Sequence, residues 1–240
     1  MLWKLAFVAV LAVGVLGEYK VTDEHKQQVK DFITMVCKKT NAEDKAPEVE
    51  TAVLTFGECV TGLFDASTLQ REIEEAKPNG ALDEVFKKYC AKSPQLKACI
   101  HAVTAGATPC LPAEFRDHVA VADNATDKLL DFACHKDGDR IALFIAEGGP
   151  QCFQEKSNAI RDCTNSLKST FTSVQAATAL TTAERCAKFD ETAACVVTAL
   201  EGCSNPTPAN MAESLLKFVR TVTPCNAIPQ WGMDENSRNA

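Results

Sequence analysis

Twelve cysteines constrain this 240-residue chain more than any other feature, because part of their spacing occurs twice. The segment Cys90–Ile100 reads CAKSPQLKACI, and the segment Cys186–Val196 reads CAKFDETAACV. Both cysteines, both alanines and the lysine of this pattern recur 96 residues later, and the neighbouring cysteines keep a similar spacing. A regular repeat of this kind indicates that one structural unit was duplicated.

The cysteine spacing aligns the two repeats in chain order. The alignment matches Cys37, Cys59, Cys90, Cys99 and Cys110 with Cys134, Cys163, Cys186, Cys195 and Cys203. We expect the last four cysteines of each set to have the same disulfide connectivity. A similar apolar helix precedes Cys37, Cys134 and Cys225, which predicts that the final helix opens an unfinished third repeat and caps the second.

Residues 1–17 have the pattern of a secretory signal peptide. One early charge, Lys4, precedes the apolar run Leu5–Leu16, and the segment ends at Gly17. The run is shorter than the ~20 residues that a membrane-spanning helix needs, and polar sequence follows it directly. We therefore expect a secreted, extracellular protein that begins at Glu18 and has no membrane span.

Secretion determines how the cysteines are interpreted. All twelve follow the signal peptide, and none forms the C-x-x-C pair of zinc sites and redox motifs. In an oxidising compartment an even number of such cysteines predicts structural disulfides. We expect bridges at Cys37, Cys59, Cys90, Cys99, Cys110, Cys134, Cys152, Cys163, Cys186, Cys195, Cys203 and Cys225, with connectivity left open beyond the matching sets.

Apolar residues recur at three- and four-residue spacing through most of the chain, as in Val29, Phe32, Ile33 and Val36. This periodicity predicts an all-α fold, a disulfide-rich helical bundle of two tandem repeats plus a terminal capping helix. The first repeat spans residues 18–120 and the second, with its capping helix, 121–225. We expect them to pack as one unit because no Gly- or Pro-rich linker separates them. Residues 226–240 are expected to be a disordered tail.

Three local predictions depend on single residues. Ser67 is expected to start one helix, and Ser93-Pro94 to end a helix and cap the next. Asp190 is expected to replace that cap in the second repeat, so that each repeated segment turns a corner between two helices. The apolar run Ile141–Ala146 is interpreted as helix, because Gly148 and Gly149 follow it as a helix terminator would.

No catalytic or metal-binding constellation stands out. His25, His101 and His118 have no Ser, Cys or carboxylate at motif spacing, and every thiol is expected to be oxidised. The segment from His135 to Asp139 lacks the further ligands of an EF-hand and is interpreted as a solvated turn. The net charge of −7 argues against binding nucleic acid or anionic membranes. We expect no cofactor and no enzymatic activity.

Two binding features are predicted. Asn124-Ala125-Thr126 is an N-x-[ST] sequon, so Asn124 is a predicted glycosylation site at the surface. The apolar helix faces also admit a carrier of a lipid or hormone, which would need a closed cavity of roughly 300–1,000 Å³. That cavity would be lined by Phe56, Val60, Phe86, Ile100, Phe189 and Val196.

The signal peptide, the twelve cysteines, the paired C-A-K-x5-A-C segments and the mature length together resemble the insect 27 kDa hemolymph glycoproteins. The resemblance covers about Lys20 to Cys225. It implies a soluble, secreted blood protein whose domain has no established molecular activity, and it supplies no catalytic residues. The leading hypothesis is thus a non-enzymatic extracellular protein with an unknown partner. An apolar small molecule is the second hypothesis, and a secreted enzyme the third.

Overall fold

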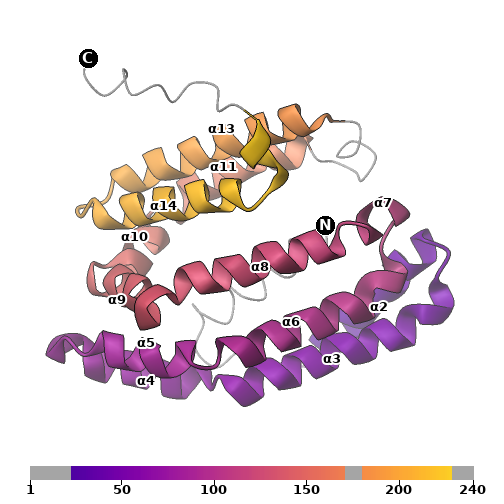
Figure 1. Cartoon of the computed structure of the whole chain (residues 1–240), viewed down its shortest axis with the longest axis horizontal. Coiled ribbons are helices and arrows are strands. Elements are labelled where there is room, and N and C mark those ends of the chain that lie inside the picture. Colours follow the sequence, from indigo (N-terminus) through magenta and orange to yellow (C-terminus); the bar gives the residue numbers. More distant parts are fainter. Residues whose placement is uncertain (1–22, 171–179, 229–240) are drawn as a thin grey trace. The chain divides into compact units, whose positions relative to one another are not determined.

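A computed structural model describes residues 23–170 and 180–228 (Figure 1), and every regular element in these two ranges is a helix. The predicted all-α class is confirmed. The signal peptide and residues 229–240 of the predicted tail lie outside the described residues. Residues 226–228 were expected to be disordered, but Asn226 and Ala227 belong to a short 3-10 helix, which corrects that prediction.

The chain divides between Gly138 and Asp139 into two compact units. The first contains α2 (Asp23–Lys39), η1 (Glu43–Lys45), α3 (Ala46–Leu63), α4 (Ala66–Ala76), η2 (Lys77–Asn79), α5 (Leu82–Cys90), α6 (Ser93–Ala107), η3 (Thr108–Cys110), α7 (Ala113–Arg116), α8 (Val119–Ala133) and η4 (His135–Gly138). The second contains α9 (Asp139–Ala146), α10 (Gly149–Glu155), α11 (Ser157–Thr170), α13 (Thr182–Glu201), α14 (Thr207–Thr221) and η5 (Pro224–Ala227). The predicted repeat boundary at residues 120 and 121 falls inside α8. That the two repeats pack as one unit stays a prediction.

The first unit is built on α6, which packs against α3 on one side and α8 on the other (Figure 1). The pair α3 and α6 comes very close at Gly106, where an added Cβ would lie 2.4 Å from Ala52 Cβ. Two helical turns away along both helices, Cys59 and Cys99 form a disulfide. Residues seven apart share one helix face, so the glycine contact and the bridge hold the same interface.

The second unit repeats this arrangement with α13 at its centre, packed against α11 and α14. The disulfide between Cys163 and Cys195 joins α11 to α13. Seven residues beyond Cys195, an added Cβ on Gly202 would lie 3.1 Å from Nζ of Lys156, which itself stands seven residues before Cys163. Both repeats therefore place a glycine two turns after the same cysteine, but only Gly106 lies against the bridged helix. Gly202 meets the flexible end of Lys156, which precedes α11.

The core of each unit is small and includes sulfur atoms. In the first unit Ile33, Ala46 and Val49 surround Cys37 and Cys110. In the second, Leu200 has no exposed surface and packs with Cys152, Ala209 and Ala212. Few large side chains are fully buried among the described residues, so hydrophobic burial alone gives each unit limited stability. The disulfides are therefore a large part of what holds the helices together.

The structure pairs all twelve cysteines, three bridges within each unit. The first unit contains Cys37–Cys110, Cys59–Cys99 and Cys90–Cys134; the second contains Cys152–Cys203, Cys163–Cys195 and Cys186–Cys225. In chain order, each unit joins its first cysteine to its fifth, its second to its fourth and its third to its sixth. This shared order is consistent with duplication, which remains our interpretation.

The pairing corrects two correspondences made from spacing. Cys37 was aligned with Cys134, but its bridge to the fifth cysteine makes Cys152 its counterpart. Cys134 and Cys225 each close a unit by bridging to its third cysteine. The helix α14 is therefore the counterpart of α8 and completes the second unit, whereas it was expected to open a third. Spacing misled because the segment between the first two cysteines is longer in the first unit, where it contains most of α3.

The expected corner is present in only one repeat. In the first unit α5 ends at Cys90 and α6 begins at Ser93, because Pro94 lacks an amide proton and its ring would clash with the carbonyl four residues earlier. Ser93 makes no capping hydrogen bond there. In the second unit α13 continues unbroken through Cys186 and Cys195, so the predicted corner at Asp190 is wrong. Asp190 occupies the position that Pro94 has in the first repeat, and its backbone amide can donate the helical hydrogen bond that a proline cannot.

Other helix ends follow local chemistry. Pro47 lies in the first turn of α3, where its missing amide proton costs no helical hydrogen bond. The residue that caps α4 is Asp65, whereas Ser67 was expected: Asp65 Oδ1 accepts hydrogen bonds from the Thr68 amide at 2.6 Å and from the Ser67 hydroxyl at 2.7 Å. Hydrogen bonds from Thr68 and then Ser67 lower the Asp65 pKa to about 2. The run Ile141–Ala146 is helical, as predicted.

We predict that the second-to-fourth bridges contribute alike in the two units. Replacing Cys59 and Cys99 with Ser should lower the free energy of unfolding by about 3–4 kcal/mol, because the bridge closes a loop of 40 residues. Replacing Cys163 and Cys195, which close 32 residues, should cost nearly as much. Guanidinium titration measures both changes. Peptide mapping without reduction is the control, and a different order of pairing in the two units would contradict the prediction.

A second prediction concerns the close approach of α3 and α6. Gly106→Ala should destabilise the protein by about 1–3 kcal/mol, because the new methyl group has no room beside Ala52. Gly57→Ala on α3 is the matched control: nothing lies within 4 Å of its added Cβ, so it should stabilise by about 0.5–1 kcal/mol. Thermal unfolding followed by circular dichroism separates the two. Equal effects at the two positions would mean that Gly106 is not in tight contact.

Candidate functional site

A partly open groove lies along α13 and α14 of the second unit and has a volume of about 190 Å³. Its apolar lining comes mainly from Phe189, Ala193, Ala194 and Val197 of α13 and from Leu216 of α14. The two consecutive alanines leave space because their side chains are short. The charged side chains of the lining are Asp190, Glu201, Glu213, Lys217 and Arg220.

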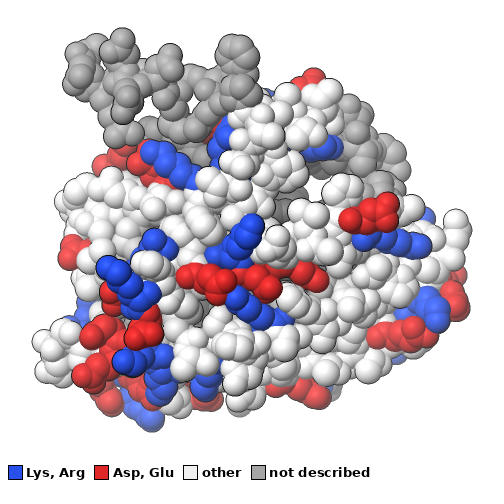
Figure 2. All heavy atoms as spheres, viewed as in Figure 1, with Lys and Arg blue, Asp and Glu red and all other residues white. Residues whose placement is uncertain are grey.

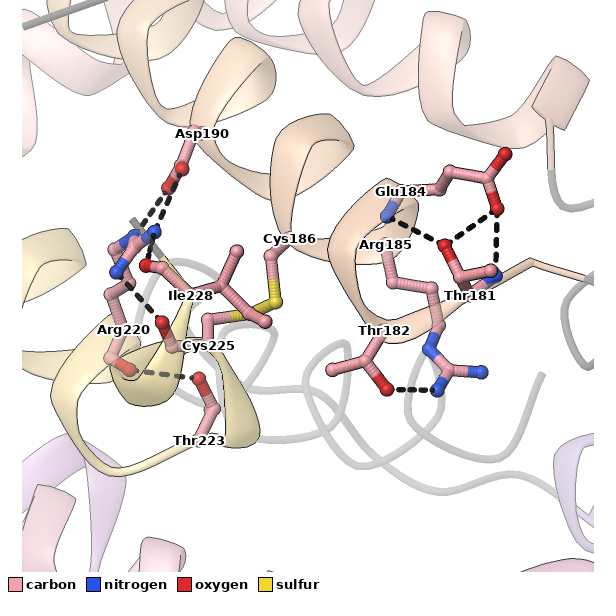
Figure 3. Close-up of a disulfide and its surroundings, with 10 residues drawn as sticks. All are labelled: Thr181, Thr182, Glu184, Arg185, Cys186, Asp190, Arg220, Thr223, Cys225 and Ile228. Atoms are coloured by element: carbon pink, nitrogen blue, oxygen red, sulfur yellow. Dashed lines mark hydrogen bonds and ion pairs between the residues drawn. A yellow bond between two sulfur atoms is a disulfide. The ribbon is translucent and has the colours of Figure 1, made fainter. Parts of the chain in front are cut away.

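Arg220 holds one end of this groove (Figure 3). Its Nε donates to Asp190 Oδ1 at 2.9 Å, and its Nη2 donates to Asp190 Oδ2 at 3.2 Å, which makes a two-point ion pair. The same guanidinium donates to the carbonyl oxygens of Cys225, at 2.8 Å, and Ile228, at 2.9 Å. The two charged side chains are 12% and 16% exposed, so this ion pair is weakly screened by solvent.

The disulfide between Cys186 and Cys225 lies beside this ion pair and fixes η5 to α13 (Figure 3). Cys186 is almost fully buried. Its bridge and Arg220 are thus two independent attachments, one covalent and one electrostatic, on the last described segment of the chain. Together they fix the direction in which the chain leaves α14.

The start of α13 is fixed by a reciprocal cap, also drawn in Figure 3. The Glu184 amide donates to Thr181 Oγ1 at 3.2 Å, and the Thr181 amide donates to Glu184 Oε2 at 2.7 Å. The hydrogen bond from the Thr181 amide, more than that from its hydroxyl, lowers the pKa of Glu184. This carboxylate is therefore used in helix capping.

His101 meets a carboxylate that the sequence did not reveal. Its Nε2 lies 2.9 Å from Asp127 Oδ1 on α8. The pair belongs to a row of three contacts between α6 and α8, with Lys97 and Thr104 of α6 bonded to Asp131 at 2.6 Å and Asp123 at 2.9 Å. The His101 side chain is 43% exposed. Helix packing accounts for the pair, since the contacts above and below it follow at three- or four-residue spacing along both helices.

The segment after Cys134 forms a left-handed turn. Lys136 and Asp137 have φ of 49° and 60°, and Gly138 has φ of 95°. Gly138 also lies against α5, where an added Cβ would be 2.7 Å from Phe86 Cβ. His135 is exposed, as the solvated turn predicted. Within residues 23–170 and 180–228, no group of three or more His, Cys, Asp or Glu side chains could hold a metal ion.

Asn124 is an exposed residue of α8. The hydroxyl of Thr126, the other essential residue of the sequon, donates to the Ala122 carbonyl at 2.9 Å. Glycosylation at Asn124 stays a prediction.

The lysine of the repeated C-A-K segment has different roles in the two units. Lys92 donates to the Leu63 carbonyl at the end of α3, and its ammonium lies over the rings of Phe64, at 5.7 Å, and Tyr89, at 5.4 Å. Lys188 pairs with Glu191 at 2.7 Å on its own helix. Lys92 thus satisfies an end carbonyl of α3. Neither role was predicted.

Opposite charges are interspersed on the face drawn in Figure 2. In the first unit ion pairs join Lys88 to Glu72 and Lys97 to Asp131. The hydrogen bond from Lys88 lowers the pKa of Glu72, and the same contact raises the pKa of Lys88. No helix of the described ranges has the length and hydropathy to cross a membrane.

A model of the family described as protein of unknown function (DUF1397) matches residues 23–225, from the start of α2 to Cys225. The chain belongs to this family. No solved structure matches it significantly.

Three curated relatives agree with this assignment. The chain is 59% identical to the 27 kDa hemolymph protein of Galleria mellonella, in an alignment that covers 94% of this chain and 97% of that protein. It is 53% identical to the 27 kDa glycoprotein of Bombyx mori, over 96% and 99% of the two chains. It is 49% identical to the 27 kDa hemolymph glycoprotein of Manduca sexta, over 95% and 98%. With its six disulfides, this DUF1397 member is a secreted, extracellular protein, and its family has no known enzymatic function.

We predict that Arg220 and Asp190 stabilise the protein as a pair. Arg220→Ala should lower the free energy of unfolding by about 2–4 kcal/mol, because it leaves the weakly exposed Asp190 carboxylate and two carbonyls without their donor. Asp190→Ala should have a similar cost, and the double variant should cost less than the sum of the two. Urea unfolding of the four proteins gives this coupling energy.

Lys217→Ala is the control for this cycle. Lys217 lies on the same helix and pairs with Glu213 at 2.9 Å in an exposed position four residues away. Its loss should change the free energy of unfolding by no more than about 0.5 kcal/mol. Additive effects of the Arg220 and Asp190 substitutions would contradict the predicted coupling.

Proposed function

We propose that this chain acts in body fluid as a non-enzymatic binding protein. The observation that carries the proposal is the groove along α13 and α14, which joins an apolar lining to charged side chains. A surface of this kind suits recognition of another chain, since apolar side chains supply contact area and charged ones fix orientation. The relatives named as hemolymph proteins support an extracellular setting for such binding.

A carrier of a small apolar ligand is the second candidate, favoured by the apolar lining of the same groove. Its volume of about 190 Å³ is below the roughly 300–1,000 Å³ of typical ligand sites. A second hollow, between α2, α3 and η3, measures about 20 Å³, room for about one water molecule. Of the six side chains expected to line a cavity, Phe189 alone lines either hollow. The geometry therefore ranks the carrier below partner binding.

Native mass spectrometry of the protein purified from body fluid tests these candidates. If the protein binds a macromolecular partner, the spectrum should show a defined complex of the disulfide-bonded chain, with any glycan, and that partner. No small molecule should be present in a stoichiometric amount. Organic extraction of the same sample is the control. Recovery of one fatty acid, terpenoid or sterol per chain would replace the proposal with the carrier.

An enzymatic role has its own test. His101 and Asp127 are a histidine and a carboxylate that lie within hydrogen-bonding distance of each other. Any activity found in the purified protein and abolished in His101→Gln, with unchanged circular dichroism, would overturn the non-enzymatic proposal.

A further inference from the structure

The end of the described chain leads directly to the groove along α13 and α14. Arg220 lines that groove and holds the carbonyl of Ile228, the last described residue. Twelve residues, 229–240, follow Ile228. Their place of departure is therefore fixed at one end of the groove, both by Arg220 and by the bridge at Cys225.

The sequence of this segment matches what the groove can accept. It reads PQWGMDENSRNA and contains one aromatic residue, Trp231. A groove of about 190 Å³ has room for one aromatic side chain, since an apolar cavity of about 150 Å³ binds benzene. A carboxylate of the lining, such as that of Glu201, can accept a hydrogen bond from the indole N–H, which a buried tryptophan needs.

The distances also agree. Trp231 is three residues beyond Ile228, so its Cα can reach about 10 Å from that of Ile228. The lining residues of α14 extend from Glu213 to Arg220, which spans about 10 Å of helix. Trp231 can therefore reach the part of the groove near Leu216, four residues from Arg220 on α14, without moving η5.

We propose that the groove along α13 and α14 is the docking site of the chain's own segment 229–240, with the Trp231 indole seated against Ala193, Ala194 and Leu216. Docking within one chain needs little affinity, because the short connection keeps the segment at a high effective concentration. The bound segment covers the apolar lining. This inference does not rest on the proposed function.

Tryptophan fluorescence tests the proposal directly. The chain has two tryptophans, Trp3 and Trp231, and removal of residues 1–17 leaves Trp231 as the sole emitter. In secreted protein whose intact mass verifies this, Trp231 emission should lie at shorter wavelength, and acrylamide quenching should be weaker, than in the reduced, denatured chain. Equal values in the two states would overturn the proposal. Loss of the difference on dilution would also overturn it, by showing that the groove of a second copy is the acceptor.

Two substitutions locate the contact. Ala194→Glu and Leu216→Glu place a charge in the groove and should shift emission and quenching to the values of the denatured chain. Ala194 is exposed, so its substitution leaves the core intact. Leu215→Glu is the matched control: Leu215 is 41% exposed, neighbours Leu216 on α14 and does not line the groove. Its spectrum should be unchanged. If the two groove variants retain the native fluorescence, Trp231 is not docked there.

A truncation after Ile228 tests whether the segment covers the groove. It keeps Cys225 and the contacts of Arg220 but removes the proposed occupant. The truncated protein should bind the apolar dye ANS more strongly than the full chain, and Ala194→Glu in the truncated protein should abolish the increase. Unchanged dye binding after truncation would show that the segment does not cover the groove.

Discussion

The disulfide between the second and fourth cysteines is the constraint on which each unit depends. In both units it joins the central helix to its neighbour. In the first unit a glycine two turns away also lets the same two helices come together. Cys59–Cys99 and Gly106 act on α3 and α6, while Cys163–Cys195 joins α11 to α13. A covalent bond at one point and close contact at another fix both the register and the separation of a helix pair. The remaining two bridges of the first unit join α2 to η3 and α5 to the end of α8. Those of the second join α10 to the residue that follows Gly202 and α13 to η5.

This arrangement explains how modest hydrophobic cores suffice. Half-buried apolar side chains are common in both units, and the fully buried positions are largely alanines and half-cystines. Small side chains bring less transfer free energy but allow backbones to approach. Polar contacts supply further specificity at the next interface, and they differ between the units. The first unit joins α6 to α8 with a row that includes His101 and Asp127, whereas the second joins α13 to α14 with the Arg220–Asp190 pair.

Much of the helical architecture followed from the sequence because it depends on local periodicity, including the helix at Ile141–Ala146. The cysteine correspondences did not, because spacing measures chain length and bonding depends on three-dimensional proximity. For this reason the spacing matched Cys37 with Cys134, whereas the disulfides make Cys152 its counterpart. The groove and the Arg220 contacts were not predicted, since they join residues 30 positions apart with no motif. One available signal was overlooked: a glycine follows each C-A-K-x5-A-C segment at the same distance, at Gly106 and Gly202.

The six bridges are also separated along the chain. Every cysteine of the first unit, ending at Cys134, precedes every cysteine of the second, beginning at Cys152. During translocation into an oxidising compartment, the first unit can therefore complete its bonds before the next cysteines emerge. Domains generally fold in this N-terminal-first order as they are synthesised. Six cysteines allow 15 pairings, so two successive searches of this size replace one search among all twelve. The order of the cysteines thus gives the chain a vectorial route to oxidation that does not require bonds to be exchanged between its halves.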